Sequence, residues 1–431
     1  MISVTKADGI AERQLIKQLK ARSGEVDRKV TLTVGEIIED VRLNGDDALK
    51  KYTQKFDGVV PENIEITREE LEQSLLNSSA DFIESLKRAA ENIKDFHEKQ
   101  SSQSWFNTYE NGSIMGQRVR GLERVGIYVP GGTAAYPSSV LMNAIPAKIA
   151  GVGEIIMVTP PLKDGSANQD ILAAAAIAGV DRVFLVGGAQ AVAALAYGTK
   201  AIPKVDKIVG PGNIYVATAK KLLFGTVDID MVAGPSEILI VADETAKPEY
   251  VAADLMSQAE HDVLASSILL TTSKTLAEKT VEELKRQCLY LSRKDIIEKS
   301  LKDYGAIIIC DSIDKAISFA NELAPEHLEM CVENPLSYIG EIDNAGSVFL
   351  GNYSPESLGD YYAGPNHVLP TGGTARFFSP LSVESFVKKS SFIYYTRKAL
   401  DDAHDDIIRL ANAEGLTAHA NSVEIRYGGK K

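Results

Sequence analysis

One short stretch of the sequence has the residue types and the spacing of a metal site. Gln258 and His261 stand three residues apart near the end of an expected helix, so their side chains lie on one helix face and can converge on one point. Histidine is a common metal ligand, but glutamine is an uncommon one. On these two residues alone, a solvated helix face is the more ordinary interpretation.

A second stretch carries two groups suited to proton transfer. Glu326 and His327 are adjacent and lie directly before a possible strand. A carboxylic acid and an imidazole have different intrinsic pKa values, so together they can serve two proton-transfer steps. The same pair is equally consistent with the C-terminal end of a helix, where a histidine favours the helix dipole.

Two further segments each combine a carboxylate with a histidine. A loop bounded by Gly and Pro carries Asp360 and His367, and the segment after an expected C-terminal helix carries Glu414 and His419. Two histidines, Asp360 and an amide oxygen would make a nitrogen and oxygen ligand set for zinc or a similar divalent ion.

The other histidines and the cysteines offer less chemistry. His97 and His404 lie in charged helical stretches, which predicts solvated surface positions. Cys288, Cys310 and Cys331 show no C-x-x-C spacing and form no disulfide framework, which favours a reducing compartment. Cys288 ends an expected helix and Cys310 an expected strand, so we expect burial rather than reactivity.

Composition narrows the class of protein. The chain has 431 residues, 45% of them hydrophobic and 24% charged, and a net charge of −13. Such a negative surface repels phosphate backbones and anionic lipids, so we expect neither a nucleic-acid partner nor a membrane partner. The N-terminus lacks the apolar stretch of a signal peptide, and the apolar run 171–180 is too short for a membrane span. The sequence therefore predicts a cytoplasmic protein.

The elements that must position these residues begin with helices. Apolar residues at helical spacing predict packing helices within 34–56 and 69–99. From Arg124 onward, short β-branched runs alternate with Ala-rich runs, which is typical of a parallel sheet covered on both faces. The expected strands and the helices that follow them are 125–129 and 139–149, 155–159 and 168–178, 183–186 and 189–197, and 207–209 and 214–223.

Glycine-rich loops follow three of these strands. They are Pro130-Gly131-Gly132, Gly187-Gly188 and Gly210-Pro211-Gly212-Asn213. They stand where strand ends meet helix N-termini, the edge at which such sheets bind ligands. Because no G-x-G-x-x-G follows an expected first strand, this pattern alone does not establish a dinucleotide site.

A second α/β series follows, and the chain closes with a small tail. Strands are expected at 237–241, 267–271, 306–309 and 347–350, with helices at 248–260, 275–290 and 313–322. The fold class is therefore α/β, with two related parallel-sheet domains. The tail 381–431 is mostly helical by pattern and buries little by itself, so we expect it to dock on the body or on a second subunit.

Nine ordered blocks of sequence resemble one family over essentially the whole chain. They are GIYVPGGTAAYPSSVLMNAIPAKIAGV, VGGAQAVAALAYGT, KIVGPGNIYVATAK, DMVAGPSEILIVAD, DLMSQAEHD, LAPEHLE, GSVFLG, SPESLGDYYAGPNHVLPTGGTARF and EGLTAHANS. The chain resembles the L-histidinol dehydrogenases, which are homodimeric enzymes that use zinc and NAD. The resemblance implies oxidation of L-histidinol through an enzyme-held aldehyde to L-histidine, the end of histidine biosynthesis.

The resemblance also implies roles for individual residues, and no matched position is altered. One zinc ion per subunit would be held by Gln258, His261, Asp360 and His419. Glu326 and His327 would be the proton acceptors. The substrate contacts would be the four zinc ligands together with Ser236, His327, His367 and Glu414. The contacts to NAD would be Tyr128, Gln190 and Asn213. His419 and Glu414 would come from the partner subunit's tail.

The domain division expected with this resemblance has four parts, with incomplete Rossmann-like sheets. Residues 1–23 would be an N-terminal extension, and residues 24–127 with 238–380 would form the main α/β domain that carries the metal and acid–base residues. Residues 128–237 would form a second α/β domain with the cofactor loops. Residues 381–431 would be a helical tail exchanged between two subunits.

Three alternatives remain open. The first keeps the fold but changes the substrate, because related dehydrogenases oxidise other small alcohols, including sulfonated diols. A zinc hydrolase would need no redox cofactor. A non-catalytic binding protein would have no use for the Glu326–His327 pair. Ser236, His367 and Glu414 favour histidinol, since a cationic amino group calls for a nearby carboxylate.

Overall fold

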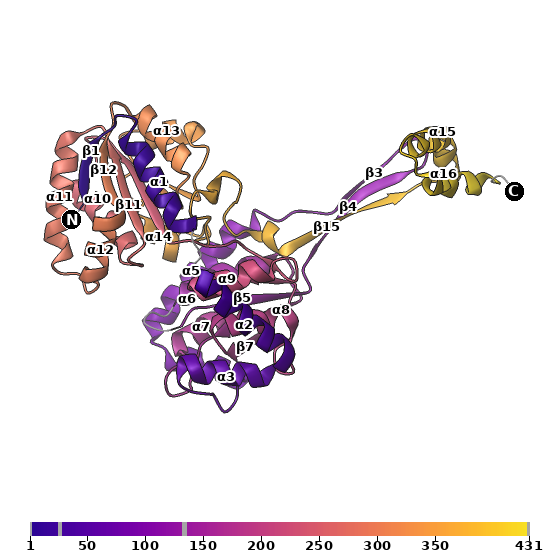
Figure 1. Ribbon diagram of the computed structural model, residues 1–431, viewed down its shortest axis with the longest axis horizontal. Coiled ribbons are helices and arrows are strands. Elements are labelled where there is room, and N and C mark those ends of the chain that lie inside the picture. The colour runs from indigo at the N-terminus through magenta and orange to yellow at the C-terminus, as the bar shows by residue number, and fades with distance from the viewer. Residues whose placement is uncertain (1, 25–27, 132–135, 429–431) are drawn as a thin grey trace. The chain divides into compact units, whose positions relative to one another are not determined.

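The computed structural model describes residues 2–24, 28–131 and 136–428, so Gly132 of the first glycine-rich loop lies outside the described residues. The chain divides into two compact units (Figure 1). Unit 1 comprises Met1–Ser101 and Leu122–Phe386, and unit 2 comprises Ser102–Gly121 and Val387–Lys431. Unit 1 contains two six-stranded sheets with helices on both faces, which confirms the predicted α/β fold class.

Sheet A is parallel throughout, in the order β1-β12-β11-β10-β13-β14. Its strands are β1 (Ser3–Lys6), β10 (Glu237–Ala242), β11 (Ser266–Thr271), β12 (Gly305–Ile309), β13 (His327–Cys331) and β14 (Ser347–Leu350). Alternate residues of β10 point to opposite faces, so Leu239 packs with one set of helices and Ile240 with the other. Figure 1 shows the first set, α1 (Ala11–Gly24) and α13 (Ile313–Leu323), across the sheet from α10 (Pro248–Ala259), α11 (Lys274–Cys288) and α12 (Lys294–Tyr304).

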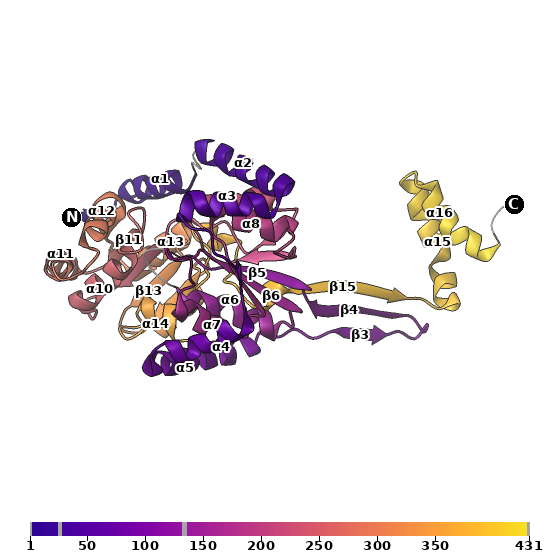
Figure 2. The ribbon, with the colours of Figure 1, turned by 90° about the horizontal axis from the view of Figure 1, so that it is seen from below.

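Sheet B has the order β2-β7-β6-β5-β8-β9, and only the short β2 runs antiparallel to its neighbour. Its strands are β2 (Glu65–Ile66), β5 (Arg124–Tyr128), β6 (Glu154–Thr159), β7 (Arg182–Leu185), β8 (Lys207–Val209) and β9 (Asp228–Ile229). One face carries α2 (Arg28–Asn44), α3 (Asp46–Asp57), α8 (Gly188–Tyr197) and α9 (Ile214–Leu223). The other face carries α5 (Ala80–Glu98), α6 (Pro137–Ile149) and α7 (Gln169–Ala178), with α4 (Arg68–Asn77) beside α7, as Figure 2 shows.

Unit 2 is a three-stranded antiparallel sheet with two helices. Its sheet order is β15-β4-β3. The elements are β3 (Trp105–Thr108), β4 (Ile114–Gly121), β15 (Val387–Tyr394), α15 (Arg397–Ala413) and α16 (Thr417–Glu424). The Thr396 side chain caps α15 by accepting a hydrogen bond from the Ala399 N–H. The helical tail is thus confirmed from Arg397, whereas residues 383–386 form a 3-10 turn and residues 387–394 form β15.

The structure differs from the expected domain division in the N-terminal third. Residues 1–23 are not an extension, because β1 pairs with β12 and α1 packs on sheet A. Most of residues 24–127 belong with sheet B, since α2, α3 and α5 pack on it and β2 and β5 are two of its strands. An amphipathic helix shows that one face is buried, but not which sheet buries it. In the described part of the chain, no helix is long and apolar enough to cross a membrane.

Candidate active site

One cavity in unit 1 collects most of the predicted site residues. Its volume is about 330 Å³. The predicted residues that line it are Asn213, Ser236, Gln258, His261, Glu326, His327, Asp360 and His367. Side chains at the amino ends of β10 and β13 face it from sheet A, and the loop after β8 faces it from sheet B.

The metal-type donors come from α10 and the short helix α14 (Glu356–Tyr361). Gln258 lies in the last turn of α10, and the N–H of His261 donates to the Gln258 carbonyl at 3.2 Å. A single hydrogen-bonded turn of backbone therefore carries both side chains. The ligand atoms of His261, Glu356 and Asp360 lie within 4.8 Å of one another. Gln258 Oε1 is buried and has no hydrogen-bond partner among the described residues.

The charges around these donors fit a divalent cation. Burial is the main cause that raises the pKa of Asp360 well above its ordinary value, and Glu356 beside it raises that pKa further. Burial likewise raises the pKa of Glu326 well above its ordinary value. Carboxyl groups crowded in a buried space are costly to ionise unless a cation offsets them. The mixed nitrogen and oxygen set is one that zinc accepts.

The backbone of one residue holds both predicted proton acceptors. The Glu237 N–H donates to Glu326 Oε2 at 2.9 Å, and the Glu237 carbonyl lies 3.0 Å from His327 Nδ1. Because a carbonyl only accepts, Nδ1 carries the proton, which leaves a lone pair on Nε2. That Nε2 is buried and has no hydrogen-bond partner in the described part of the chain. Burial lowers the pKa of His327, so the ring stays neutral at neutral pH.

His367 joins the metal-type donors to helix α6. Its Nδ1 donates to the Asp360 carbonyl at 3.0 Å, and its Nε2 accepts from Ser139 Oγ at 3.3 Å. Burial is the main cause that lowers the pKa of His367 to about 4. Ser139 also lines the cavity, and sequence reasoning missed it. Its signal was weak, a serine in the first turn of a helix after Pro137.

A buried ion pair fixes the sheet B side of the cavity, and this too was missed. Lys220 and Asp230 form a salt bridge with both side chains almost fully buried. Lys220 Nζ donates to the Gly210 carbonyl at 2.9 Å, and the Gly210 N–H donates to Asp230 Oδ2 at 2.8 Å. Gly210 has φ +108, and a Cβ there would lie 2.2 Å from the Tyr128 carbonyl oxygen, so only glycine fits.

Known proteins match this architecture over the full chain. The histidinol dehydrogenase family model matches residues 20–427. The chain is 58% identical over 427 residues to histidinol dehydrogenase of Clostridium acetobutylicum, which covers 99% of both chains, and 57% identical over 415 residues to that of Caldanaerobacter subterraneus, which covers 96% of both. A crystal structure of histidinol dehydrogenase from Elizabethkingia anophelis superposes with a TM-score of 0.92 at 40% identity, over 99% of this chain and 98% of that one.

The chain belongs to the histidinol dehydrogenase family.

The resemblance read from the nine sequence blocks is thereby confirmed. So is the assignment of the chain as an enzyme, an NAD-dependent dehydrogenase, and its place among the oxidoreductases of histidine biosynthesis.

The predicted NAD contacts in this histidinol dehydrogenase fold lie in two places. Asn213 lines the cavity and caps α9 by accepting hydrogen bonds from the N–H groups of the next turn. Tyr128 and Gln190 are buried at the Gly187-Gly188 loop, where the Tyr128 hydroxyl accepts the Gly188 N–H at 3.0 Å. Burial raises the pKa of Tyr128 to about 12. Both amide atoms of Gln190 lack a partner among the described residues.

Two predicted residues of the histidinol dehydrogenase site belong to unit 2. His419 lies in α16 and Glu414 is the C-cap of α15, and both are exposed. The described residues that line the cavity all belong to unit 1.

Of the predictions for the other histidines and the cysteines, the one for His97 is wrong and the one for Cys288 and Cys310 is confirmed. His97 is fully buried rather than solvated, because its Nδ1 donates to the Ile93 carbonyl and its Nε2 accepts from Asn366. His404 is half-buried against Tyr427. Cys288 and Cys310 are free and buried as predicted, and Cys331 is also free and buried. Burial raises the pKa of Cys310 to about 11.

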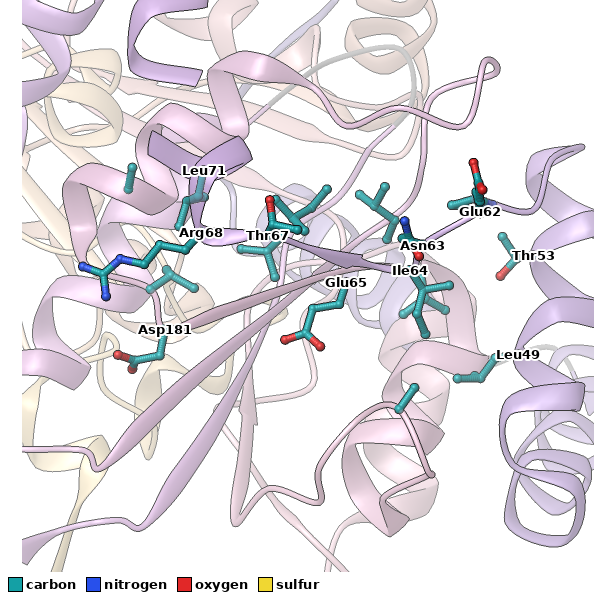
Figure 3. Close-up of a pocket in the computed structure, with 18 of the residues that line it drawn as sticks. Leu49, Thr53, Glu62, Asn63, Ile64, Glu65, Thr67, Arg68, Leu71 and Asp181 are labelled. Atoms are coloured by element: carbon teal, nitrogen blue, oxygen red, sulfur yellow. The ribbon is translucent and has the colours of Figure 1, made fainter. Parts of the chain in front are cut away.

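A larger hollow of unit 1 lies away from these groups (Figure 3). It has a volume of about 990 Å³ and is lined by α3, α4 and the segment around Glu65. Glu65 pairs with Arg182 at 2.6 Å, and Asp181 pairs with Lys148 at 2.8 Å, so these charges are already neutralised. Since none of the predicted site residues lines this hollow, its size does not make it the active site of a histidinol dehydrogenase.

Proposed function

We propose that this enzyme oxidises L-histidinol to L-histidine through L-histidinal, consuming two NAD and one water. The observation that carries the proposal is the meeting, in one cavity, of the Glu326–His327 pair with the donors Gln258, His261 and Asp360. Overall, RCH2OH + H2O + 2 NAD⁺ gives RCOO⁻ + 2 NADH + 3 H⁺. Each oxidation passes a hydride from the substrate carbon to NAD and releases a hydroxyl proton.

His327 is the base for both hydroxyl protons. Its Nε2 lone pair is free, and the bond from Nδ1–H to the Glu237 carbonyl fixes the direction of the ring. It accepts the alcohol proton as the first hydride leaves. It then accepts a hydrate proton as the second hydride leaves, after passing the first to solvent.

Glu326 activates the water that adds to the aldehyde. Its carboxyl lies beside the histidine, with Oε2 3.7 Å from His327 Nδ1, and its own orientation is fixed by the Glu237 N–H. As a carboxylate it removes a proton from water while the oxygen bonds to the aldehyde carbon.

Gln258, His261, Asp360 and His419 of the partner subunit would hold one zinc ion in each subunit of a cytoplasmic homodimer with exchanged tails. When bound, zinc supplies a positive charge that orients the imidazole and amino nitrogens of the substrate. Ser236 and His367 would contact the substrate from the same cavity, and Glu414 of the partner subunit would face its cationic amino group.

The sheet B loops would bind NAD through Tyr128, Gln190 and Asn213. Loops after parallel strands at helix N-termini suit a pyrophosphate, because backbone N–H groups and the helix dipole favour negative charge. The absence of a complete glycine fingerprint favours a loosely held cofactor that exchanges between the two oxidations.

The test is the yield of NADH from a limiting amount of L-histidinol with zinc-loaded enzyme and excess NAD. We expect two NADH for each histidinol, and none after a chelator removes the zinc. One NADH would indicate an alcohol dehydrogenase that releases the aldehyde and would remove the role of Glu326. No NADH would point to another small alcohol, such as a sulfonated diol, or to a hydrolase.

A further inference from the structure

Two buried carboxyl groups beside the metal-type donors have no part in the reaction above. They are Glu329 on β13 and Glu356 at the start of α14, whose own carboxyl lies within 4.8 Å of His261 and Asp360. Both side chains are almost fully buried, with 1% and 2% of their surfaces exposed. Burying an acid is costly unless its oxygens are used, so these positions call for an explanation.

Glu329 is bonded to the backbone of Glu356. Its Oε1 accepts the Glu356 N–H at 2.8 Å, which satisfies one of the backbone donors left free at the start of α14. A single side chain of β13 therefore holds the first turn of α14.

Helices α10 and α14 carry the metal-type donors. Gln258 lies in the last turn of α10 and His261 just after it, and Asp360 follows Glu356 on α14. The Glu356 carboxyl continues the link to α10, because its Oε2 accepts from Ser257 Oγ at 2.9 Å. The connection therefore runs from Glu329 through Glu356 to both helices that carry donors.

Glu329 also shares its strand with the proton acceptor. Residues two apart on a strand point to the same face, so the side chain of Glu329 stands next to that of His327 on β13. The carboxyl group of Glu329 therefore links the strand that carries the base to helix α14.

We propose that Glu329 is a positioning residue for the metal centre, which sets the spacing of Gln258, His261 and Asp360 through its bond to the Glu356 N–H and the bond between Glu356 and Ser257 of α10. The role rests on the proposed zinc site. Outer groups that orient metal ligands commonly change metal affinity by about 10–100-fold when removed.

Two substitutions at this position separate hydrogen bonding from charge. In Glu329→Gln the amide oxygen can still accept the Glu356 N–H, so we expect zinc affinity within about threefold of wild type. In Glu329→Ala this acceptor is lost, and we expect zinc affinity to fall by about 10–100-fold. Affinity is measured by chelator competition on the dimeric protein, together with the visible spectrum of the Co²⁺-loaded form.

Cys331→Ala is the matched control. Cys331 lies two residues further along β13, on the same face and equally buried, but outside this network. We expect its zinc affinity and Co²⁺ spectrum to match wild type. If Glu329→Ala lowers the unfolding midpoint as the control does but keeps full zinc affinity, Glu329 is structural only and the inference is wrong. Loss of affinity in Glu329→Gln as large as in Glu329→Ala would also overturn it.

A second variant carries the test if Glu329→Ala does not fold. Ser257→Ala removes only the hydrogen bond that ties Glu356 to α10, and we expect a smaller loss of zinc affinity, about 3–10-fold. Unchanged affinity in that variant contradicts the proposal. Failure of the zinc site itself is distinguishable, because wild type and His261→Asn would then hold equal zinc before any change at Glu329.

Discussion

Sheet A and sheet B have the same number of strands and similar helical layers, yet they meet the cavity with opposite strand ends. Sheet B presents the loop after β8, with Asn213 at the start of α9. Sheet A presents the residues at which β10 and β13 begin, including Glu326 and His327. The carboxyl end of sheet B offers backbone donors suited to an anion, while the amino end of sheet A offers side chains held by buried strands.

The difference indicates a division of labour. Rigid strand starts suit groups that must move protons at fixed positions, whereas a loop suits a cofactor that enters and leaves. We therefore expect changes on the sheet A side to affect metal content and the chemical steps, and changes on the sheet B side to affect NAD. The predictions below test this, from the largest expected effect to the smallest.

His261→Asn should abolish activity and zinc binding together. The substitution removes the imidazole from a donor set whose atoms lie within 4.8 Å of one another. Zinc content of the purified protein and NADH formation are the measurements. A variant that keeps one zinc per subunit would show that His261 is not a ligand and that the sheet A edge works without it.

His327→Asn should lower the rates of both oxidations by about 10²–10⁴-fold, because the free Nε2 lone pair is the base in each. Zinc content should stay at the wild-type level, in contrast to His261→Asn. Single-turnover rates with histidinol and with histidinal check both steps. A loss confined to one substrate would contradict the shared role.

Glu326→Gln should lower aldehyde oxidation by about 10²-fold and alcohol oxidation by only a few-fold, since water is activated in the second oxidation alone. The amide oxygen can still accept the Glu237 N–H, so the geometry is kept. The ratio of the two single-turnover rates is the readout. Equal losses would remove the division between the two proton acceptors.

Lys220→Met tests the sheet B side. Removing one partner of a buried ion pair costs about 3–5 kcal/mol of stability and releases the Gly210 carbonyl. We expect the KM for NAD to rise by about tenfold, with kcat and zinc content little changed. Lys221→Met, on the exposed neighbouring position of α9, is the control. A fall in zinc content rather than in NAD affinity would contradict the division of labour between sheet A and sheet B.

The smallest effect concerns pH. His367 has a folded pKa of about 4 against 6.5 when unfolded, so the unfolded chain binds the proton first as pH falls. Its contribution to stability is full above pH 6.5 and declines as pH drops toward 4. Between pH 7 and pH 5 the zinc-free wild type should lose about 2 kcal/mol more than His367→Asn. Denaturant unfolding at the two pH values measures this, and equal losses would contradict the neutral buried ring.

The local pattern of apolar residues predicted many of the helices and strands well. The expected strand 207–209 and helix 214–223 agree with β8 and α9 residue for residue. Prediction of strands from alternating apolar and polar residues fails where both faces of a strand are exposed. The residues of β15 are largely exposed, and the sequence pattern placed them in the helical tail. The partner sheet of α2 and α3 could not be predicted, because burial of a helix face does not name the surface that covers it.

The candidate site was predictable where unusual residue types stand close in sequence, as with Gln258 and His261. It was not predictable for Glu356 and Lys220, whose roles arise only when α14 and α9 reach the cavity. The prediction for His97 was wrong because its charged neighbours in sequence suggested a solvated position. In the structure its side chain is buried and bonded to Asn366, which lies far along the chain. Tertiary contacts of this kind leave no periodic signal in the sequence.

The backbone of Glu237, and not its side chain, orients both Glu326 and His327. Main-chain groups are identical in every amino acid except for the missing N–H of proline, so most substitutions at position 237 leave the hold on both acid and base intact. An insertion that slides β10 against β13 by one residue would instead turn both groups away together. The proton-transfer geometry is therefore less sensitive to substitution at position 237 than to a shift in strand register, so redesign for other alcohols has to preserve the length of β10.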